Sequence, residues 1–351
     1  QIIHGTTLAT NAIIERKGAT TAFITTTGFR DVIEMRTESR FEQYDLNLAM
    51  PLPLISREHR YVVNERLSAT GEILIPIDKN QILDLVANLS NQGYQSIAVG
   101  LIHSYANDRH EKYIKNILSK HFPKTMLSIS SEVSPQMREY ERFNTVCANA
   151  YVKPLIKSYL MRLKKKLIKQ KIICPIFLMH SGGGIISLNS AAEFPVRLIE
   201  SGPAGGAVFA STIAKKHKIK NTLSFDMGGT TAKICLIKDQ KPKTNQVFEV
   251  ARSYRFKKGS GMPISIPVID MVEIGAGGGS LAHVDDLQQI RVGPQSAGSN
   301  PGPACYDLGG TKPTVTDADL LLGKLSEEGF AGGSLSLNKS NSKKAINVKI
   351  G

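Results

Sequence analysis

Apolar and polar positions alternate along the first third of the chain in a way that predicts strands and helices in turn. Short apolar runs rich in β-branched residues have the length of strands, and the segments between them repeat apolar residues at helical spacing. The predicted strands are residues 19–25, 61–67, 95–102 and 125–130, and the predicted helices are residues 79–89 and 108–121. This alternation is typical of an α/β layer with parallel strands, in which residues 61–67 form an edge strand.

A long helix is predicted from Pro135 to Lys171, because proline is favoured in the first turn of a helix. Pro154 is expected to kink or break this helix, since an internal proline removes a hydrogen bond. Near the start of the helix, Arg138, Glu139 and Arg142 either reach a cleft or pair with one another on the surface.

The chain is organised around residues 222–237, which read as a strand, a glycine turn and a second strand. Asp226 ends the first strand, and the turn contains Gly228, Gly229, Thr230 and Thr231. Paired glycines let a backbone approach a ligand, consecutive N–H groups form an anion-binding concavity, and a carboxylate at the strand end is able to hold Mg²⁺ through water. The segment suits a nucleotide phosphate, although the lysine-bearing P-loop pattern is absent from the sequence. The alternative is a tight hairpin of a β-protein.

A second glycine cluster follows a strand predicted over residues 264–274. It consists of Gly275, Gly277, Gly278, Gly279 and Ser280, and it superficially resembles the glycine fingerprint of dinucleotide-binding domains. That fingerprint requires a helix directly after the glycines, whereas this chain continues with two short β-like runs. A backbone packed against the base or ribose of a nucleotide fits the segment better.

A helix is predicted over residues 314–325, with Thr316 or Asp317 as its cap. Just before it, Cys305 has no activating base nearby in the sequence, so a buried small residue is a better interpretation than a nucleophile.

Two other polar turns lead into helices. Near the start of the chain, Thr6 or Thr7 is the expected N-cap of a helix, and His4 is either a general acid or a structural histidine. Farther along, Ser201 and Gly202 open a helix that runs to about residue 214. The free N–H groups at such helix starts suit an anion or a polarised carbonyl, and the alternative for each glycine cluster is a sharp connection.

Composition narrows the class of protein. A length of 351 residues with 41% hydrophobic residues predicts two or three domains, and no run approaches the roughly 20 apolar residues of a membrane span. Four cysteines without a CxxC pattern argue for a reduced, cytoplasmic compartment rather than for disulfides or a zinc site. The formal charge of +14 comes from lysine clusters that we interpret as solvated helix faces, because no aromatic residues interleave with them to stack on bases.

Seven blocks, in one order from residue 1 to about 325, resemble the hydantoinase A/5-oxoprolinase family. They are HGTTLATNAIIERKGA, TTTGFRDV, SGPAGGAV, FDMGGTTAKICLI, IGAGGGSLAHVDD, VGPQSAGSNPGPACY and PTVTDADLLLGKL. The resemblance implies an α/β fold of the actin/Hsp70/sugar-kinase-like ATPase class, with RNase H-like lobes around a nucleotide cleft.

Two features depart from the family pattern. The family normally begins with an Asp-x-Gly-Gly-Thr-Phe-Thr-Asp hairpin ahead of the HGTT block, so we expect a chain truncated at its N-terminus. Many members also have aspartate where this chain has Lys233, which either contacts a phosphate, marks altered handling of the metal, or points away from the cleft.

The resemblance also implies a division of the chain and a set of roles. Residues 1–185 correspond to the hydantoinase/oxoprolinase N-terminal type and residues 186–351 to a hydantoinase A-type ATPase region that is incomplete at its C-terminus. The implied activity is the ATP- and Mg²⁺-dependent opening of a cyclic amide (hydantoin, N-methylhydantoin or 5-oxoproline) after phosphorylation of the amide oxygen. The resemblance assigns catalysis to Asp226, as a base or through Mg²⁺-bound water, and to His4. Both glycine clusters are expected to bind the nucleotide. The residues expected to face the substrate are Thr6, Thr7, Asn11, Ser201 and Gly202.

The expected partners are the small-molecule substrate and a hydantoinase B-type subunit, in an oligomer without nucleic acid or membrane. Two other interpretations stay open: the ATP-binding subunit of an acetone- or acetophenone-carboxylase-like complex, and a non-catalytic nucleotide-gated binding module. The sequence does not identify the substrate, because such a pocket draws on residues from several loops.

Overall fold

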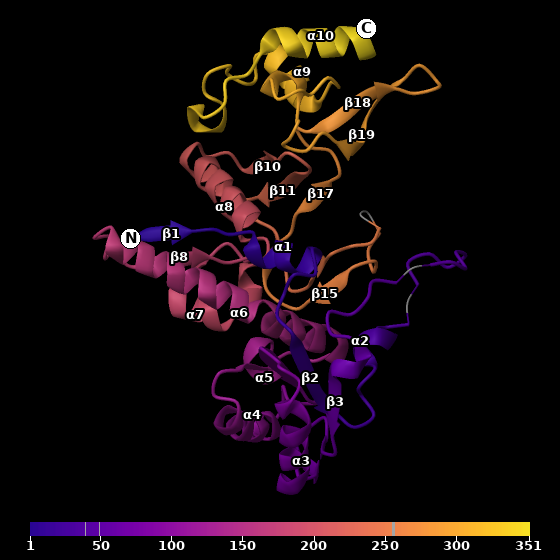
Figure 1. The fold of residues 1–351 in the computed structure, drawn as a ribbon, viewed down its shortest axis with the longest axis vertical. Helices are drawn as coiled ribbons and strands as arrows, with labels where there is room; N and C mark the ends of the chain where they lie inside the picture. Colours follow the sequence, from indigo (N-terminus) through magenta and orange to yellow (C-terminus); the bar gives the residue numbers. More distant parts are fainter. Residues whose placement is uncertain (39, 49, 255–256) are drawn as a thin grey trace. The chain divides into compact units, whose positions relative to one another are not determined.

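The computed structural model describes residues 1–351 except residues 39, 49, 255 and 256. The segments 36–60 and 253–258 therefore lie partly outside the described residues. The chain forms two compact units (Figure 1). Unit 1 comprises residues 1–208 and 244–269, and unit 2 comprises residues 209–243 and 270–351. The division at residues 185/186 that the resemblance implies is a different partition, and it stays a prediction.

Unit 1 contains the predicted α/β layer. Its four strands are all parallel, in the order β3 (Arg60–Val63), β2 (Thr21–Thr26), β6 (Ser96–Gly100) and β7 (Met126–Ile129). Helices α3 (Lys79–Ser90) and α4 (Arg109–His121) cover one face, where Ile24 packs with Leu85 and Ile114. Helix α6 (Glu139–Lys169) covers the other face, where Phe23 meets Phe143. Burial on both faces explains why the central strands carry apolar residues at successive positions, as at residues 22–24 of β2 and 97–99 of β6.

The edge strand predicted over residues 61–67 is wrong in its extent. It is divided into β3 and a separate strand β4 (Arg66–Leu67), which pairs with β5 (Ile73–Ile75). The division falls at Glu65, whose buried carboxylate accepts a hydrogen bond from the Thr26 hydroxyl and lies 2.6 Å from the Nδ1 atom of His110. These interactions hold Glu65 against β2 and α4, between the two short strands.

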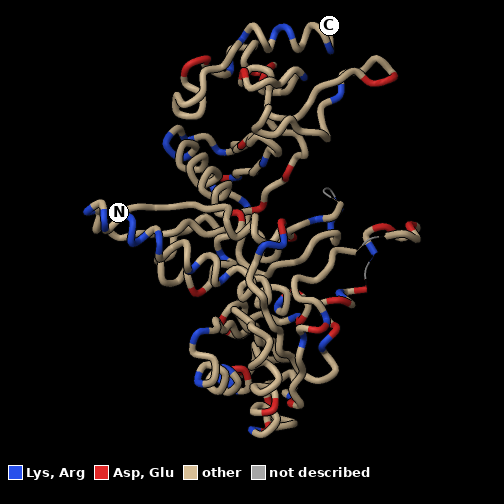
Figure 2. Tube along the Cα trace, viewed as in Figure 1, with Lys and Arg blue, Asp and Glu red and all other residues tan. Residues whose placement is uncertain are grey.

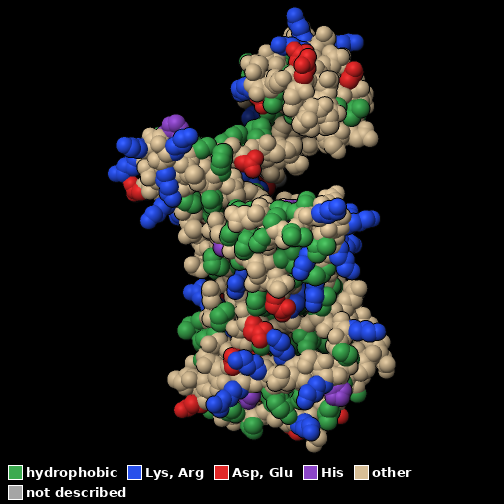
Figure 3. All heavy atoms as spheres, turned by 90° about the vertical axis from the view of Figure 1, so that its left-hand side faces the viewer, with side chains coloured by type: hydrophobic (Ala, Val, Ile, Leu, Met, Phe, Trp, Pro, Cys, Tyr) green, Lys and Arg blue, Asp and Glu red, His purple; other side chains and the backbone are tan. Residues whose placement is uncertain are grey.

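Helix α6 (Glu139–Lys169) is the longest helix described. It begins four residues later than predicted, because Arg138 has a φ of 82°, which a right-handed helix cannot include. Pro154 lies inside the helix, so the predicted break does not form. Lys164, Lys165, Lys166 and Lys169 are exposed near its C-terminus. Figure 2 shows how the Lys and Arg positions are distributed along the chain. On the face seen in Figure 3, Lys and Arg side chains stand in separate groups rather than in one continuous band.

A second sheet in unit 1 carries the polar turns. Strand β1 (Ile2–His4) runs parallel to β8 (Ile176–Met179), which pairs with the antiparallel β9 (Ile185–Ser187). Helix α1 (Leu8–Ile14) follows β1, and helix α8 (Ser201–Lys216) begins in this unit. The remaining elements of unit 1 are α2 (Val32–Met35), α5 (Ser130–Val133), α7 (Leu188–Glu193), β13 (Thr244–Asn245), β14 (Phe248–Val250), β15 (Met262–Ile264) and β16 (Val268–Ile269).

Unit 2 is built on the predicted hairpin. Strands β10 (Asn221–Met227) and β11 (Ala232–Lys238) are antiparallel, which confirms a strand, a turn and a second strand. Strand β11 also pairs with β12 (Lys241–Pro242) and β17 (Val272–Ile274). A second antiparallel pair, β18 (Ser280–Val284) and β19 (Ile290–Ser296), precedes helices α9 (Val315–Leu321) and α10 (Lys339–Lys349).

Several details of the predictions for residues 264–325 are wrong, and the helix predicted over residues 314–325 is shorter, from Val315 to Leu321. The strand predicted over residues 264–274 is divided among β15, β16 and β17, and each of these pairs with a different strand. Pro267 lies between β15 and β16, and it has no N–H group to donate to a neighbouring strand. The N-cap of α9 is Thr314 rather than Thr316 or Asp317, and Asp317 is the third helical residue of a capping box. No helix in the described part of the chain is both long and apolar enough to cross a membrane.

Candidate functional site

The two glycine clusters meet in unit 2. The amides of Gly278 and Gly279 donate to the carbonyl oxygens of Gly228 (2.9 Å) and Gly229 (2.7 Å), so the loop after β17 lies directly on the hairpin turn. A Cβ atom added to Gly277 would lie 2.6 Å from the carbonyl oxygen of Gly228 and from backbone atoms of Thr230 and Thr231. Such an approach requires glycine on the loop side, and it unites segments that are about 50 positions apart in the sequence.

The turn itself stays open on its other side. The Gly228 amide closes it by donating to the Thr231 carbonyl at 2.9 Å. Gly228, Gly229 and Thr230 are exposed, and a Cβ added to Gly229 would meet no atom within 4 Å. The turn therefore combines a fixed backbone with an accessible surface, which is what binding of an anionic ligand needs.

The loop residues predicted to bind the nucleoside divide into two groups. Gly277 and Gly279 are buried against the turn, and Gly275 and Gly278 are half-buried. The hydroxyl of Ser280 is buried and accepts a hydrogen bond from the Gly277 amide at 2.9 Å, so it stabilises the loop from within. Asp226 lies in β10, one residue before the strand ends, and is exposed.

Gly277→Ala is expected to destabilise unit 2, because the added methyl group would collide with backbone atoms that cannot move separately. Overpacking of this kind costs about 1–3 kcal/mol, which thermal or urea unfolding would measure. Gly206→Ala is the control, since a Cβ there meets nothing within 4 Å and alanine is about 1 kcal/mol better than glycine inside a helix. Equal stability of the two variants would contradict the close packing.

The predicted substrate residues meet in unit 1. The Ser201 hydroxyl donates to the Thr6 carbonyl at 3.0 Å and accepts from the Thr6 amide at 3.4 Å. A Cβ added to Gly202 would lie 4.0 Å from Cγ2 of Thr7. Thr7 is the N-cap position of α1, but the side-chain hydrogen bond at this end is made by Thr6, whose hydroxyl accepts from the Leu8 amide at 3.2 Å. Asn11, in the same helix, is exposed.

His4 is half-buried at the end of β1. One of its ring nitrogens, Nε2, lies 2.7 Å from the Tyr159 hydroxyl of α6. Burial lowers the pKa of His4, so its imidazole is held neutral at neutral pH. Burial also lowers the pKa of His180, whose Nδ1 accepts a hydrogen bond from the Gly182 amide at 3.0 Å in the turn between β8 and β9. The catalytic role of His4 stays a prediction.

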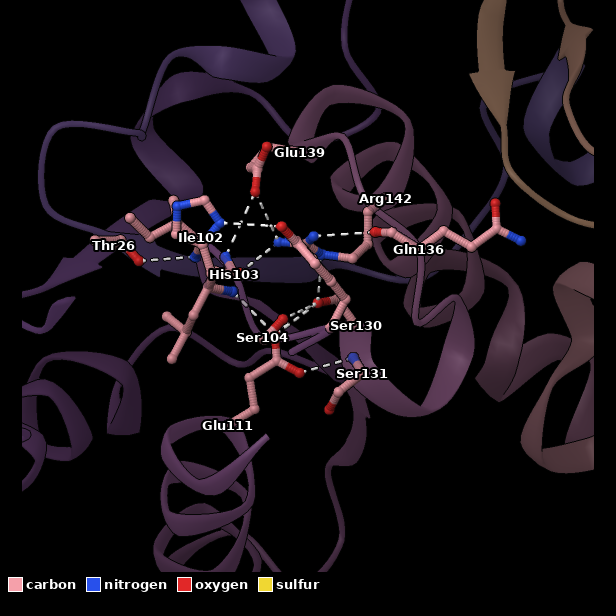
Figure 4. Close-up of polar contacts among 12 residues, drawn as sticks. Thr26, Ile102, His103, Ser104, Glu111, Ser130, Ser131, Gln136, Glu139 and Arg142 are labelled. Atoms are coloured by element: carbon pink, nitrogen blue, oxygen red, sulfur yellow. Dashed lines mark hydrogen bonds and ion pairs between the residues drawn. The ribbon is translucent and has the colours of Figure 1, made fainter. Parts of the chain in front are cut away.

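A buried charged cluster at the carboxyl ends of β2, β6 and β7 was not expected from the sequence (Figure 4). The Glu111 carboxylate accepts from the Leu101 amide (2.9 Å), the Ser130 hydroxyl (2.6 Å) and the Ser131 amide (2.8 Å). The Arg142 guanidinium, with an exposure of 0%, donates to the Leu101 carbonyl at 2.6 Å and to Glu139 at 3.4 Å. Arg142 thus pairs with Glu139, as one of the two alternatives expected, but its guanidinium is buried rather than on the surface.

This cluster has a structural function. The loops that leave the strand ends carry backbone groups outside the ladder, and buried groups of this kind must be hydrogen-bonded. Burial lowers the pKa of Arg142, but its contacts with Glu139 and the charge of Glu111 oppose that effect. Nothing in the local sequence distinguishes Arg142 from a surface arginine, so no sequence signal pointed to it.

Asp317 has the corresponding function in unit 2. Its fully buried carboxylate accepts from the amides of Cys305 (2.8 Å) and Thr314 (2.9 Å) and from the hydroxyl of Ser342 (2.8 Å). The spacing of Thr314 and Asp317 is the sequence signal of a capping box, which would have identified this carboxylate. Burial, with the nearby Asp317 charge, raises the pKa of Cys305 to about 12, so it stays a thiol, as expected of a buried structural cysteine.

Comparison with known proteins identifies the family. The model of the hydantoinase/oxoprolinase family matches residues 142–351, and that of the hydantoinase/oxoprolinase N-terminal region matches residues 1–122. The chain belongs to the hydantoinase/oxoprolinase family. The resemblance that the sequence motifs suggested is therefore confirmed.

Two relatives of this hydantoinase/oxoprolinase chain show how much of a longer protein it matches. An uncharacterized protein of Methanocaldococcus jannaschii is 40% identical over an aligned length of 351 residues. The match covers 98% of this chain and 52% of the relative. The caprolactamase subunit alpha of Pseudomonas jessenii is 34% identical over 350 residues, which cover 99% of this chain and 49% of that subunit. The chain thus spans about half the length of the curated relatives it matches.

Two solved structures are similar to the fold. The crystal structure of the ATP-dependent caprolactamase of Pseudomonas jessenii has a TM-score of 0.79 and 33% identity, and the match covers 98% of this chain and 49% of that one. Nucleotide-free acetone carboxylase has a TM-score of 0.75 and 25% identity, with coverages of 99% and 49%. The mixed α/β fold of this family member is therefore shared with a caprolactamase and with acetone carboxylase.

Proposed function

We propose that the protein is part of an ATP-dependent hydrolase that opens a cyclic amide, with an actin/Hsp70/sugar-kinase-like ATPase fold. The observation that carries the proposal is the exposed glycine turn beside Asp226, fixed from behind by a second glycine segment. The similarity of nearly the whole chain to an ATP-dependent caprolactamase supports the same proposal. The substrate would be a lactam or cyclic imide, such as caprolactam, hydantoin, N-methylhydantoin or 5-oxoproline.

The chemistry follows from the poor reactivity of an amide. Transfer of the γ-phosphoryl group breaks its bond to the bridging oxygen of ADP and forms a bond to the amide oxygen. The amide carbon becomes electrophilic, water adds, and the C–N bond breaks. Hydrolysis of the phosphorylated species releases phosphate, so ATP, lactam and two water molecules give ADP, phosphate and an amino acid. The protein's contribution is positioning and stabilisation of charge.

Residues of this chain take distinct roles in the proposal. The Gly228 amide closes the turn by donating to Thr231, so the backbone N–H group of Gly229 and the hydroxyls of Thr230 and Thr231 would bind the phosphates. Asp226 would orient the reacting water or accept its proton. In unit 1, the turn of Thr6 and Thr7 with Ser201 would contact the amide, with Gly202 and Asn11 beside it and His4 as a second acid–base group.

The residues beside the turn do not fit a Mg²⁺ ion held by the protein. The described residues contain no group of three or more His, Cys, Asp or Glu side chains able to hold a metal. The residue opposite Asp226 in the hairpin register is Lys233, a cation. No step of the proposed reaction is therefore assigned to a protein-bound metal, and the Mg²⁺ expected with ATP would be the one that the nucleotide carries.

Phosphate release from ATP tests the proposal. We expect release by the purified full-length protein, with its B-type subunit where one is encoded, only when a lactam or cyclic imide is present. Release that needs a ketone and bicarbonate instead would favour a carboxylase subunit, for which the similarity to acetone carboxylase is the supporting observation. Tight ATP binding without turnover of any compound would indicate a nucleotide-gated binding module and would contradict the hydrolase.

A further inference from the structure

Three charged residues form one row across the sheet of unit 2. In the antiparallel register, Asp226 of β10 pairs with Lys233 of β11, and Lys233 pairs with Glu273 of β17. Directly opposite residues on antiparallel strands leave the sheet on the same face, with Cβ atoms about 4.5–5.5 Å apart. The stem of Lys233 therefore rises between two carboxylate-bearing side chains.

This row borders the glycine turn. Only one further residue pair, Met227 with Ala232, separates it from the turn that Gly228 closes. Strand β17 continues from Glu273 into the glycine loop that lies on the same turn. Asp226 and Glu273 are exposed and Lys233 is half-buried, so the row is accessible to an ion or ligand at the turn.

An ammonium group and a divalent cation compete for such a position. Two carboxylates on neighbouring strands would attract a divalent cation, whose preferred ligands are carboxylate and water oxygens. A lysine between them supplies positive charge at the same place, and it repels a second cation. A lysine ammonium is also an effective point charge for phosphate, with three donors that rotate freely.

We propose that Lys233 takes the place of a protein-bound divalent cation beside the glycine turn. Without nucleotide, the row of Asp226, Lys233 and Glu273 binds no divalent cation. When nucleotide is bound, the Lys233 ammonium contacts the phosphates directly. This half of the proposal rests on the nucleotide binding of the proposed function. Any divalent cation then arrives with the nucleotide.

Mn²⁺ binding to the complete chain without nucleotide tests the first half of the proposal. By calorimetry or electron paramagnetic resonance, we expect no saturable site below about 1 mM Mn²⁺, the weak end of protein carboxylate sites. Lys233→Asp puts a third carboxylate in the row and should create one site at least about tenfold tighter. Lys238→Asp makes the same charge change on the same strand, opposite Asn221, and should create none.

ATP affinity with and without Mg²⁺ tests the second half. In EDTA, Lys233→Met should weaken ATP binding by about tenfold or more, because a charged contact with phosphate is lost, while the Lys238→Met control should bind like the unaltered chain. Tight Mn²⁺ binding by the unaltered chain would overturn the proposal, even if Lys233→Asp failed to fold. Equal ATP affinities of both methionine variants in EDTA would also overturn it. Absence of ATP binding under every condition would instead refute the proposed function and leave the Mn²⁺ result to decide the cation question.

Discussion

Asp226→Asn is expected to reduce lactam-dependent ATP turnover by at least about 100-fold, the low end of what a positioned acid–base group contributes. The amide keeps the shape of the carboxylate but cannot accept a proton from water. Asp226 is exposed in β10, so the fold should tolerate the change and the unfolding temperature should stay the same. Steady-state phosphate release with a saturating lactam is the measurement.

The matched control for this variant lies directly after β11, at the end of the hairpin opposite the glycine turn. Asp239→Asn changes an exposed aspartate whose only described ion pair is with Lys220 at 3.6 Å. Asp239 has a φ of 48°, a conformation that asparagine also adopts readily. Turnover by this variant should equal that of the unaltered protein, and a similar loss in both variants would remove the special role of Asp226.

Asp317→Asn is expected to destabilise unit 2 by about 3 kcal/mol or more, the sum of two hydrogen bonds to a charged group. One carboxylate oxygen accepts from Cys305 and Ser342, and the other accepts from Ala304 and from both donors of Thr314. An amide NH₂ cannot accept, so at least two donors lose their partner whichever way the side chain turns. Urea unfolding would measure the loss of free energy.

Asp319→Asn serves as the comparison, two residues along the same helix. Asp319 pairs at 3.1 Å with Lys324, whose side chain is 66% exposed, and pairs of this kind contribute about 1 kcal/mol or less. We expect a small change in unfolding free energy for this variant. Comparable stabilities of the two variants would show that Asp317 does not hold the segment of Ala304 and Cys305 together with α9 and α10.

Prediction from the sequence succeeded where a signal lies within one short segment. The hairpin of β10 and β11 follows from two apolar runs around paired glycines, and the parallel sheet of unit 1 follows from strands that alternate with helices. The seven motif blocks identified the family before any coordinate was known, since their order along the chain excludes coincidence.

Prediction was wrong where a distant partner decides the local conformation. The strand expected over residues 264–274 is three strands, because each part pairs with a different neighbour. The long helix starts late because Arg138 takes a conformation that a helix excludes. Arg142, interpreted as a cleft or surface residue, is instead buried among the strand ends of the parallel sheet.

The sequence by itself determined the family, the order of most helices and strands, and the residue types of the candidate site, because spacing and glycine content are local properties of a chain. Only the tertiary structure decided which of these residues meet. It brought Gly277 onto the turn at Gly228, Ser201 onto Thr6, and Lys233 between Asp226 and Glu273 in register. Strand pairing and loop packing join segments far apart in sequence, and the hydrogen bonds and steric limits that select those pairings exist only in the folded chain.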